Sequence, residues 1–228
     1  MFRSLIFVLF SISYSIANAQ GIAISKKFGG LYELDVETGE TVERYETPEF
    51  FDVSVSASGN FYGITGFSGL YRTRPNSMQL VRIGAVGVFI NALAFDENDR
   101  LFGAGNNILY QIDKDTAEPS LLMSVDGFDS SGDIAFLGSQ LYATSLHTDQ
   151  TDILYVFDLK ARKSRAIGEI GFRHVYGLVA QNGELFGLTE QNEMISIDTQ
   201  TGRGSLLGKY NLPGFSYGAT GIREPALN

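Results

Sequence analysis

Short runs of alternating apolar and polar residues recur along this chain, separated by turns rich in Gly, Asp and Asn. An apolar pair, aromatic in most copies, opens one such run at intervals of 39, 39, 45 and 40 residues. The pairs are Leu31-Tyr32, Leu70-Tyr71, Leu109-Tyr110, Leu154-Tyr155 and Met194-Ile195. Several copies continue into a turn, as in "LYELDVETGE" and "MISIDTQTGR", where Asp supplies an acceptor and Gly a permissive backbone. The pattern predicts a repeat protein built from strands and hairpins.

Two further markers repeat with nearly the same period. A second recurring segment lies upstream of the first and follows an apolar strand and a polar turn: Phe61-Tyr62-Gly63, Leu101-Phe102-Gly103, Leu141-Tyr142-Ala143 and Leu185-Phe186-Gly187. A Phe precedes each first strand, at Phe50, Phe89, Phe128, Phe172 and Phe215. Each full unit therefore holds four short strands in roughly 40 residues, which is typical of a β-propeller blade. No helical periodicity of useful length competes with this assignment.

The ends of the chain predict how the ring closes. The last unit has only its first strand, "SYGATGI", while the N-terminal segment supplies "GIAISKK", "GLYELDV" and "ETVERYE" without a first strand. Pairing the two removes an open sheet edge. We therefore expect an all-β, five-bladed propeller with four antiparallel strands per blade and Tyr217 beside Asp52. The predicted blades span 20–47 with 213–225, 48–86, 87–126, 127–170 and 171–212.

The first 19 residues have the layout of a secretory signal peptide. Arg3 is followed by an apolar run over residues 5–10 and by Ala17-Asn18-Ala19, a small-residue cleavage site. The run is too short to span a bilayer. The sequence thus predicts a signal peptide over 1–19, a single propeller domain over 20–228, and a secreted or periplasmic protein without a membrane span.

Charge and cysteine content exclude several classes of function. Without Arg3 the chain has 16 basic and 26 acidic residues, a net charge near −10 that disfavours nucleic acid and anionic membrane surfaces as partners. Cysteine is absent, which rules out disulfides, thiolate nucleophiles and Cys-ligated metals.

The "LYxIDxxTG" and "LAFDxxxxLFG" segments resemble the repeats of secreted YncE-type, quinoprotein-like and NHL-like or WD40-like β-propellers. The resemblance covers the predicted mature chain and implies the fold, but no reaction. Quinoprotein blades carry a Trp-centred docking motif, and this chain has no Trp, so a pyrroloquinoline quinone enzyme is not expected. Plant-type glutaminyl cyclases are similar in strand layout, yet their Trp- and Glu-bearing motifs have no counterpart here.

Propeller geometry places candidate binding residues at the mouth of the central channel. The loop leading into each first strand and the loop joining the second and third strands share one face in such folds. The mouth residues expected from the leading loops are Asp52, Asn91, Asp133, His174, Tyr176 and Tyr217. Asp52, Asn91 and Asp133 together offer oxygen ligands for a hard cation such as Ca²⁺. The alternative is that they cap strand ends or bind channel water, with no cofactor.

An insertion marks the blade at 127–170. Between Tyr142 and Tyr155 lie 13 positions, against 9, 8 and 9 in the comparable units. The inserted "SLHTDQTD" contains His147, Asp149 and Asp152, and should share a face with "GFRHVY", which contains Arg173 and His174. Two histidines in one sector suggest a base or metal ligands, whereas the alternative is a solvated hairpin beside an unrelated loop. Asp126, Asp129 and Asp133 form a further acidic loop without EF-hand spacing.

The symmetric Phe residues are expected to wedge between neighbouring blades, with sugar stacking by exposed rings as the alternative. The chain lacks GxSxG, HExxH and phosphate-binding glycine motifs. We therefore expect a monomeric module that binds a protein, small molecule or saccharide. The alternative is a metal-assisted hydrolase, lactonase or lyase with its ion at the channel mouth.

Overall fold

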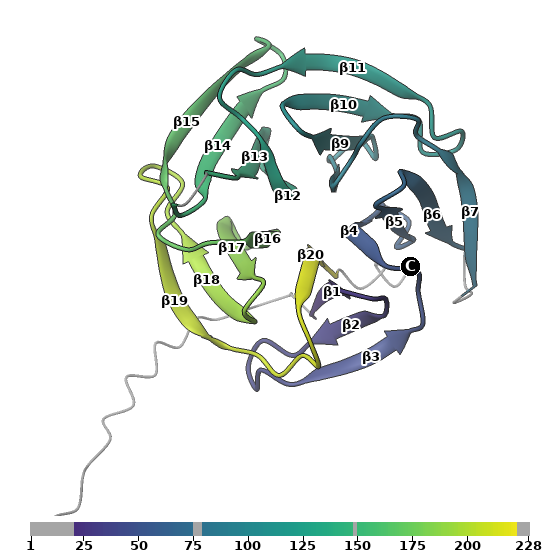
Figure 1. Cartoon of the computed structure of the whole chain (residues 1–228), viewed down its shortest axis with the longest axis horizontal. Coiled ribbons are helices and arrows are strands. Elements are labelled where there is room, and N and C mark those ends of the chain that lie inside the picture. The colour runs from purple at the N-terminus through teal and green to yellow at the C-terminus, as the bar shows by residue number, and fades with distance from the viewer. Residues whose placement is uncertain (1–20, 75–78, 148–149, 223–228) are drawn as a thin grey trace, which may run out of the picture.

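The computed structural model describes residues 21–74, 79–147 and 150–222, which form a ring of five four-stranded antiparallel sheets around a central axis (Figure 1). No helix occurs among these residues. The predicted all-β, five-bladed propeller is confirmed. The signal peptide predicted over 1–19 lies outside the described residues.

Each blade runs from an inner strand at the axis to an outer strand at the rim. Blade 1 contains β20 (Ser216–Gly221), β1 (Ile22–Lys26), β2 (Leu31–Leu34) and β3 (Thr41–Tyr45). Blade 2 contains β4 (Phe50–Val55), β5 (Phe61–Thr65), β6 (Gly69–Thr73) and β7 (Leu80–Ala85). Blade 3 contains β8 (Ala92–Phe95), β9 (Leu101–Gly105), β10 (Ile108–Ile112) and β11 (Pro119–Ser124). Blade 4 contains β12 (Ser130–Leu137), β13 (Gln140–Ser145), β14 (Ile153–Asp158) and β15 (Lys163–Glu169). Blade 5 contains β16 (Val175–Gln181), β17 (Glu184–Thr189), β18 (Glu193–Ile197) and β19 (Gly204–Lys209).

Blade 1 closes the ring as the sequence predicts. Strand β20 pairs antiparallel with β1, with Ile22 opposite Gly221 and Ile24 opposite Ala219. An N–H···O bond of 3.0 Å from Ile222 N to Gly21 O extends the pairing beyond the strands. The inner edge of β1 is thereby covered by a strand made almost 200 residues later.

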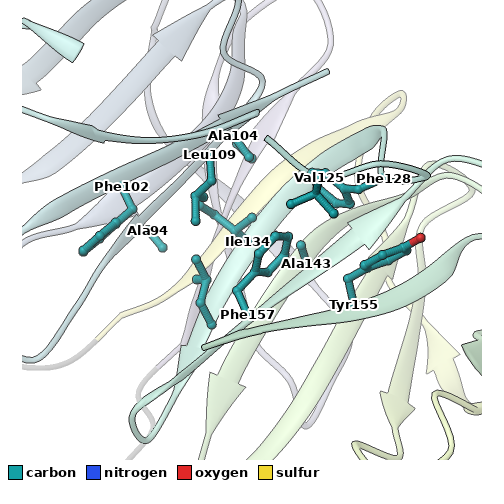
Figure 2. Close-up of a cluster of buried hydrophobic side chains, with 12 residues drawn as sticks. Ala94, Phe102, Ala104, Leu109, Val125, Phe128, Ile134, Ala143, Tyr155 and Phe157 are labelled. Carbon is teal, nitrogen blue, oxygen red and sulfur yellow. The ribbon is translucent and has the colours of Figure 1, made fainter. Parts of the chain in front are cut away.

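The core consists of apolar clusters at the seams between neighbouring blades. Figure 2 shows the cluster at the seam between blades 3 and 4, to which blade 3 contributes Phe102 of β9 and blade 4 contributes Ile134 and Phe157. The ring of Phe102 lies edge-to-face with that of Phe136 of β12, at a centroid distance of 5.2 Å. Phe128, in the loop that joins these blades, packs edge-to-face on Phe157 at a centroid distance of 5.3 Å. Each blade buries both faces of its sheet, which explains the apolar inner strands.

The outer hairpins have the turn chemistry expected from the Asp-x-x-Thr-Gly pattern. Asp35 Oδ1 accepts hydrogen bonds from Glu37 N and Thr38 N at 2.9 and 3.0 Å, and Gly39 follows with φ of 74°. Asp198 makes the same pair of bonds before Gly202. These backbone donors hold the pKa of both carboxyls below the ordinary value. The motif is therefore structural.

Candidate functional site

The loops leading into the inner strands and the loops joining second and third strands share one face, here called the mouth face. Three backbone bonds join the two sets: Leu146 N to Asp129 O (2.7 Å), Glu190 N to His174 O (2.8 Å) and Lys27 N to Phe215 O (3.0 Å). The predicted loop geometry is therefore confirmed around the channel.

Five equivalent residues, one from each inner strand, meet below the mouth face and form what we call the hub. The registers of the five sheets identify them as Asp52, Ala92, Asp133, Gly177 and Gly218. Both aspartates are 0% exposed. The other three are small because the centre has no room: a Cβ on Gly218 would lie 1.8 Å from Asp52 Oδ1. The hub therefore fills the channel with two carboxyls.

Asp52 joins blades 2 and 3. Its Oδ1 accepts a hydrogen bond from Val53 N at 2.7 Å, and its Oδ2 accepts one from Leu93 N of β8 at 2.5 Å. Both N–H groups are buried and need an acceptor. The Asp52 carboxyl supplies it where the hydrogen bonds between strands do not.

Asp133 joins blades 4, 5 and 1. Its Oδ1 accepts from Ile134 N at 2.6 Å, and its Oδ2 accepts from Leu178 N of β16 and Ala219 N of β20 at 2.5 and 3.2 Å. The two carboxyls are close enough for each to shift the pKa of the other. Together the pair connects the inner strands of all five blades.

Burial raises the pKa of both hub carboxyls. The pKa of Asp52 lies well above its ordinary value because of burial, and the neighbouring charge of Asp133 raises it further. Burial also raises the pKa of Asp133, although three backbone donors and Asp52 partly offset that effect. Because the two carboxyls are neighbours, protonation of one affects protonation of the other.

The structure separates the three residues that the sequence offers as cation ligands. Asp52 and Asp133 lie in the hub, and each of their carboxyl oxygens accepts a backbone N–H. Asn91 precedes the hub position of β8 by one residue and lies nearer the mouth, where its Nδ2 donates to Ser130 O at 2.9 Å. Within the described ranges, no group of three or more His, Asp or Glu side chains is placed to hold a metal ion.

A cavity of about 250 Å³ opens on the mouth face above the hub. Its lining consists of Lys27, Phe51, Asn91, Ser131, Gly132, Leu146, Tyr176, Glu190 and Tyr217. Phe51, Tyr176 and Tyr217 occupy equivalent positions immediately before the hub. Breaks in strand register at Phe50/Asp52 and Val175/Gly177 release Phe51 and Tyr176 from the ladder. The bulges allow these rings to line the cavity.

The three rings form a continuous aromatic wall. Phe51 and Tyr217 lie edge-to-face with centroids 5.7 Å apart, and Tyr217 and Tyr176 with centroids 6.0 Å apart. Tyr217 was expected beside Asp52. Its strand does neighbour β4, but the ring contacts Phe51, and Gly218 is the residue packed on Asp52.

Charged groups border the aromatic wall. His174 Nδ1 lies 2.9 Å from Glu190 Oε2, and its ring stacks on Tyr176 at 5.3 Å. Burial raises the pKa of Tyr176 to about 12, with smaller contributions from Glu190 and Asp152. Burial also raises the pKa of Tyr217, and Glu49 contributes both charge and a hydrogen bond. Both phenols therefore stay protonated at neutral pH.

The blade 4 insertion reaches the same face through Asp152, which is 2% exposed. Asp152 Oδ2 accepts from Ser131 Oγ and Val175 N, at 2.7 and 2.8 Å, so it joins the insertion to two inner strands. His147 is exposed beside Leu146, while Asp149 lies outside the described residues.

Other predicted site residues occupy the exposed surface. Arg173 is exposed beside His174, and Asp126 and Asp129 are exposed in the loop before β12. Among the described residues, His174 contacts two residues that line the cavity: its ring stacks on Tyr176 and its Nδ1 lies beside the Glu190 carboxylate.

The expectation that five Phe residues wedge between blades is wrong for two of them. Phe50 and Phe128 are 2% and 3% exposed at blade seams, and Phe172 packs partly buried against the seam of blades 4 and 5. Phe89 and Phe215 are instead 42% and 45% exposed. They lie in leading loops, one residue before the seam-facing Ile90 and Ser216, so the marker does not identify equivalent positions.

Exposed large apolar side chains gather on the mouth face. In the part of the chain that the structure describes, the loops of this face carry exposed Phe28, Phe67, Phe89, Leu146 and Phe215. Those exposed elsewhere lie on the outer strands: Val42, Leu121, Leu206 and Leu207. Contiguous exposed apolar groups are typical of interaction sites, whereas scattered ones are ordinary.

A larger cavity, about 540 Å³, lies at the seam between blades 5 and 1, on the face opposite the mouth face. Turn residues 36–39 and 181–184 border it, with Phe186 and Tyr210 among the apolar residues of its wall. Its wall also includes acidic and amide side chains, but Glu37, Asn182 and Glu184 are exposed in the turns. We take the mouth cavity as the candidate site despite its smaller volume, because it lies above the hub and has a wall of three contacting rings beside a buried amide oxygen.

Six lining residues were missed by sequence reasoning: Lys27, Phe51, Ser131, Gly132, Leu146 and Glu190. Phe51 had a signal, because an aromatic residue directly precedes Asp52, Gly177 and Gly218 in three units. Ser131 and Gly132 lie at the start of β12, and the other three lie in loops whose sequences are not repeated.

Comparison of the chain with protein-family models and with curated protein sequences finds no match. The described part of the chain contains no helix with the length and hydropathy needed to cross a bilayer. The resemblance to YncE-type and NHL-like repeats thus rests on the sequence segments alone.

Proposed function

We propose that this chain is an exported β-propeller that binds a ligand or partner through its mouth face in the periplasm or outside the cell. The observation that carries the proposal is the aromatic-walled cavity of about 250 Å³, surrounded by exposed Phe side chains on the same face. Concave sites with apolar walls and a few polar groups are where proteins commonly bind small molecules.

The hub supports binding over catalysis. The metal-assisted hydrolase, lactonase or lyase considered from the sequence would hold its ion with Asp52, Asn91 and Asp133, or with the two histidines. The two aspartates are not available for this role. Their oxygens instead accept backbone N–H groups at 2.5–2.7 Å and are fully buried. The hub is a rigid floor, and the groups above it offer rings, an amide and a carboxylate for recognition.

A fragment screen by ligand-observed NMR tests the proposal. Fragments that bind wild-type protein should lose binding to the double variant Tyr176→Ala/Tyr217→Ala, because the aromatic wall is removed. Leu121→Ala is the matched control, since Leu121 is 62% exposed on outer strand β11. Failure to find any fragment whose binding depends on the two tyrosines would contradict the proposal.

Export is tested separately. When the full chain is expressed in a Gram-negative host, the exported fraction should contain a protein whose first residue is Gln20, by mass spectrometry. An uncleaved chain confined to the cytoplasm would contradict export without affecting the binding proposal.

A further inference from the structure

The mouth cavity combines aromatic walls with hydrogen-bond acceptors that have capacity for a ligand. Asn91 Oδ1 is a buried acceptor without a hydrogen-bond partner among the described residues, while the Nδ2 of the same amide is already bonded to Ser130 O. Because Asn91 lines the cavity and its donor end is already bonded, its side chain offers a ligand an acceptor and not a donor. A ligand that donates a hydrogen bond would satisfy it.

Negative charge surrounds the same space. Glu190 lines the cavity, and only one of its oxygens has a described partner, His174. The acidic groups that act on the two wall tyrosines are Glu190 and Asp152 at Tyr176, and Glu49 and Glu190 at Tyr217. Lys27 is the one Lys or Arg among the lining residues. The balance of charge around the cavity favours a cation.

Lys27 already places an ammonium group at the edge of the mouth cavity. Lys27 Nζ lies 5.6 Å from the ring centroids of Phe28 and Phe215, and 6.0 Å from that of Tyr217. These distances are within the range of cation–π attraction. Tyr217 belongs both to this group and to the wall of the cavity, so the aromatic surface that faces the ligand space is one that accommodates a positive charge.

Building on the proposed binding function, we infer that the mouth cavity binds a protonated primary amine. Its N–H groups would donate to Asn91 Oδ1 and the Glu190 carboxylate, and its hydrocarbon part would pack against Phe51, Tyr176 and Tyr217. A quaternary ammonium has no N–H and would leave the Asn91 acceptor unpaired. A neutral alcohol would lose the attraction of both the carboxylate and the rings.

The size of the cavity limits the ligand. About 250 Å³ is slightly below the usual range for drug-sized ligands, which begins at about 300 Å³. The cavity suits a molecule such as an arylalkylamine, or the end of a lysine side chain presented by a peptide. Both sources share the same chemistry, and the experiment distinguishes them.

Isothermal titration calorimetry with 2-phenylethylamine and its neutral isostere 2-phenylethanol tests the inference. The amine should bind about tenfold or more tightly than the alcohol, because a charge-assisted hydrogen bond corresponds to at least that ratio. Nα-acetyl-lysine methylamide provides the peptide source. Binding of either amine supports the inference, and the tighter one identifies the source.

Matched variants locate the interaction. Glu190→Gln should weaken amine binding about five- to tenfold while leaving the alcohol unchanged, because the carboxylate acts on the charge. Glu193→Gln makes the same change of charge on β18, outside the cavity lining, and should have no comparable effect. Asn91→Leu should also weaken the amine, provided that its melting temperature stays at the wild-type value.

Equal affinity for amine and alcohol, or an effect of Glu190→Gln no larger than that of Glu193→Gln, would overturn the inference. Absence of binding by both amines would overturn it as well. If the fragment screen still yields non-amine ligands that depend on Tyr176 and Tyr217, the binding function stands and only the ligand class is wrong.

Discussion

Replacing Asp133 with alanine removes the acceptor that joins three blades. The carboxylate accepts from Ile134 N, Leu178 N and Ala219 N, so three buried donors lose their partner together. A buried donor without an acceptor costs about 1–3 kcal/mol, which gives an upper bound of roughly 9 kcal/mol for three. Loss of the buried charge offsets part of this. We expect Asp133→Ala to lower the free energy of unfolding by about 3–5 kcal/mol.

Urea denaturation provides the measurement. The protein has 11 Tyr and no Trp, so tyrosine fluorescence and far-UV circular dichroism can follow the same transition. The midpoint should fall with little change in slope, since the surface exposed on unfolding stays similar. Asp133→Asn keeps one oxygen acceptor and nearly the same volume, and should lose less stability than the alanine variant. Asp126→Ala, at an exposed aspartate, should change stability by at most about 0.5 kcal/mol.

The outcome that refutes the reasoning is a small loss. If Asp133→Ala unfolds within about 1 kcal/mol of wild type, then the hydrogen bonds of the hub do not hold the inner strands together, because each orphaned donor alone should cost that much. A large loss in Asp126→Ala would instead show that removal of acidic side chains destabilises this chain wherever they lie.

Four further predictions follow from the hub and the closing blade. The folded-state pKa values of Asp52 and Asp133 lie above the unfolded value of about 3.9, so these groups add stability at low pH that is lost as pH rises. The urea midpoint should therefore be higher at pH 5 than at pH 7. Gly218→Ala, whose Cβ would lie 2.5 Å from Asp52 Cα, should destabilise by about 3 kcal/mol or more, whereas Gly208→Ala has open space and should be nearly neutral in the same thermal melts. Deleting 213–228 removes β20, so the product should lack a cooperative thermal transition or self-associate in gel filtration. Adding EDTA should leave the melting temperature unchanged, because backbone donors and not a cation satisfy the hub; a drop of several degrees would support the cation alternative.

The blades could be predicted from the sequence because strand alternation and turn chemistry are local. Leu31-Tyr32 and its four counterparts each open the third strand of a blade, and Asp35 and Asp198 form the turns that their spacing indicates. Closure was predictable for the same reason, since counting strands left three at one end and one at the other.

The site was less predictable because burial in the channel depends on all five blades at once. Asp52 and Asn91 have similar positions in their units, but Asn91 lies one residue before the position that corresponds to Asp52. Asp52 therefore lies in the hub, whereas Asn91 lines the cavity. A period shared by five Phe residues also failed to identify one role, because Phe215 precedes its strand while Phe50 begins one. Lys27 and Glu190 come from loops that carry no repeat.

The pairing of β20 with β1 also bears on how the chain is synthesised. Strand β1 begins at Ile22 and its partner begins at Ser216, so translation at about 5–20 residues per second leaves roughly 10–40 s between them. During that interval β1 has an unpaired inner edge, and Asp133 lacks its Ala219 donor. The nascent chain therefore cannot complete its ring on the ribosome before β20 emerges. If the chain is exported as we propose, this delay would keep its ring open until it reaches a translocase.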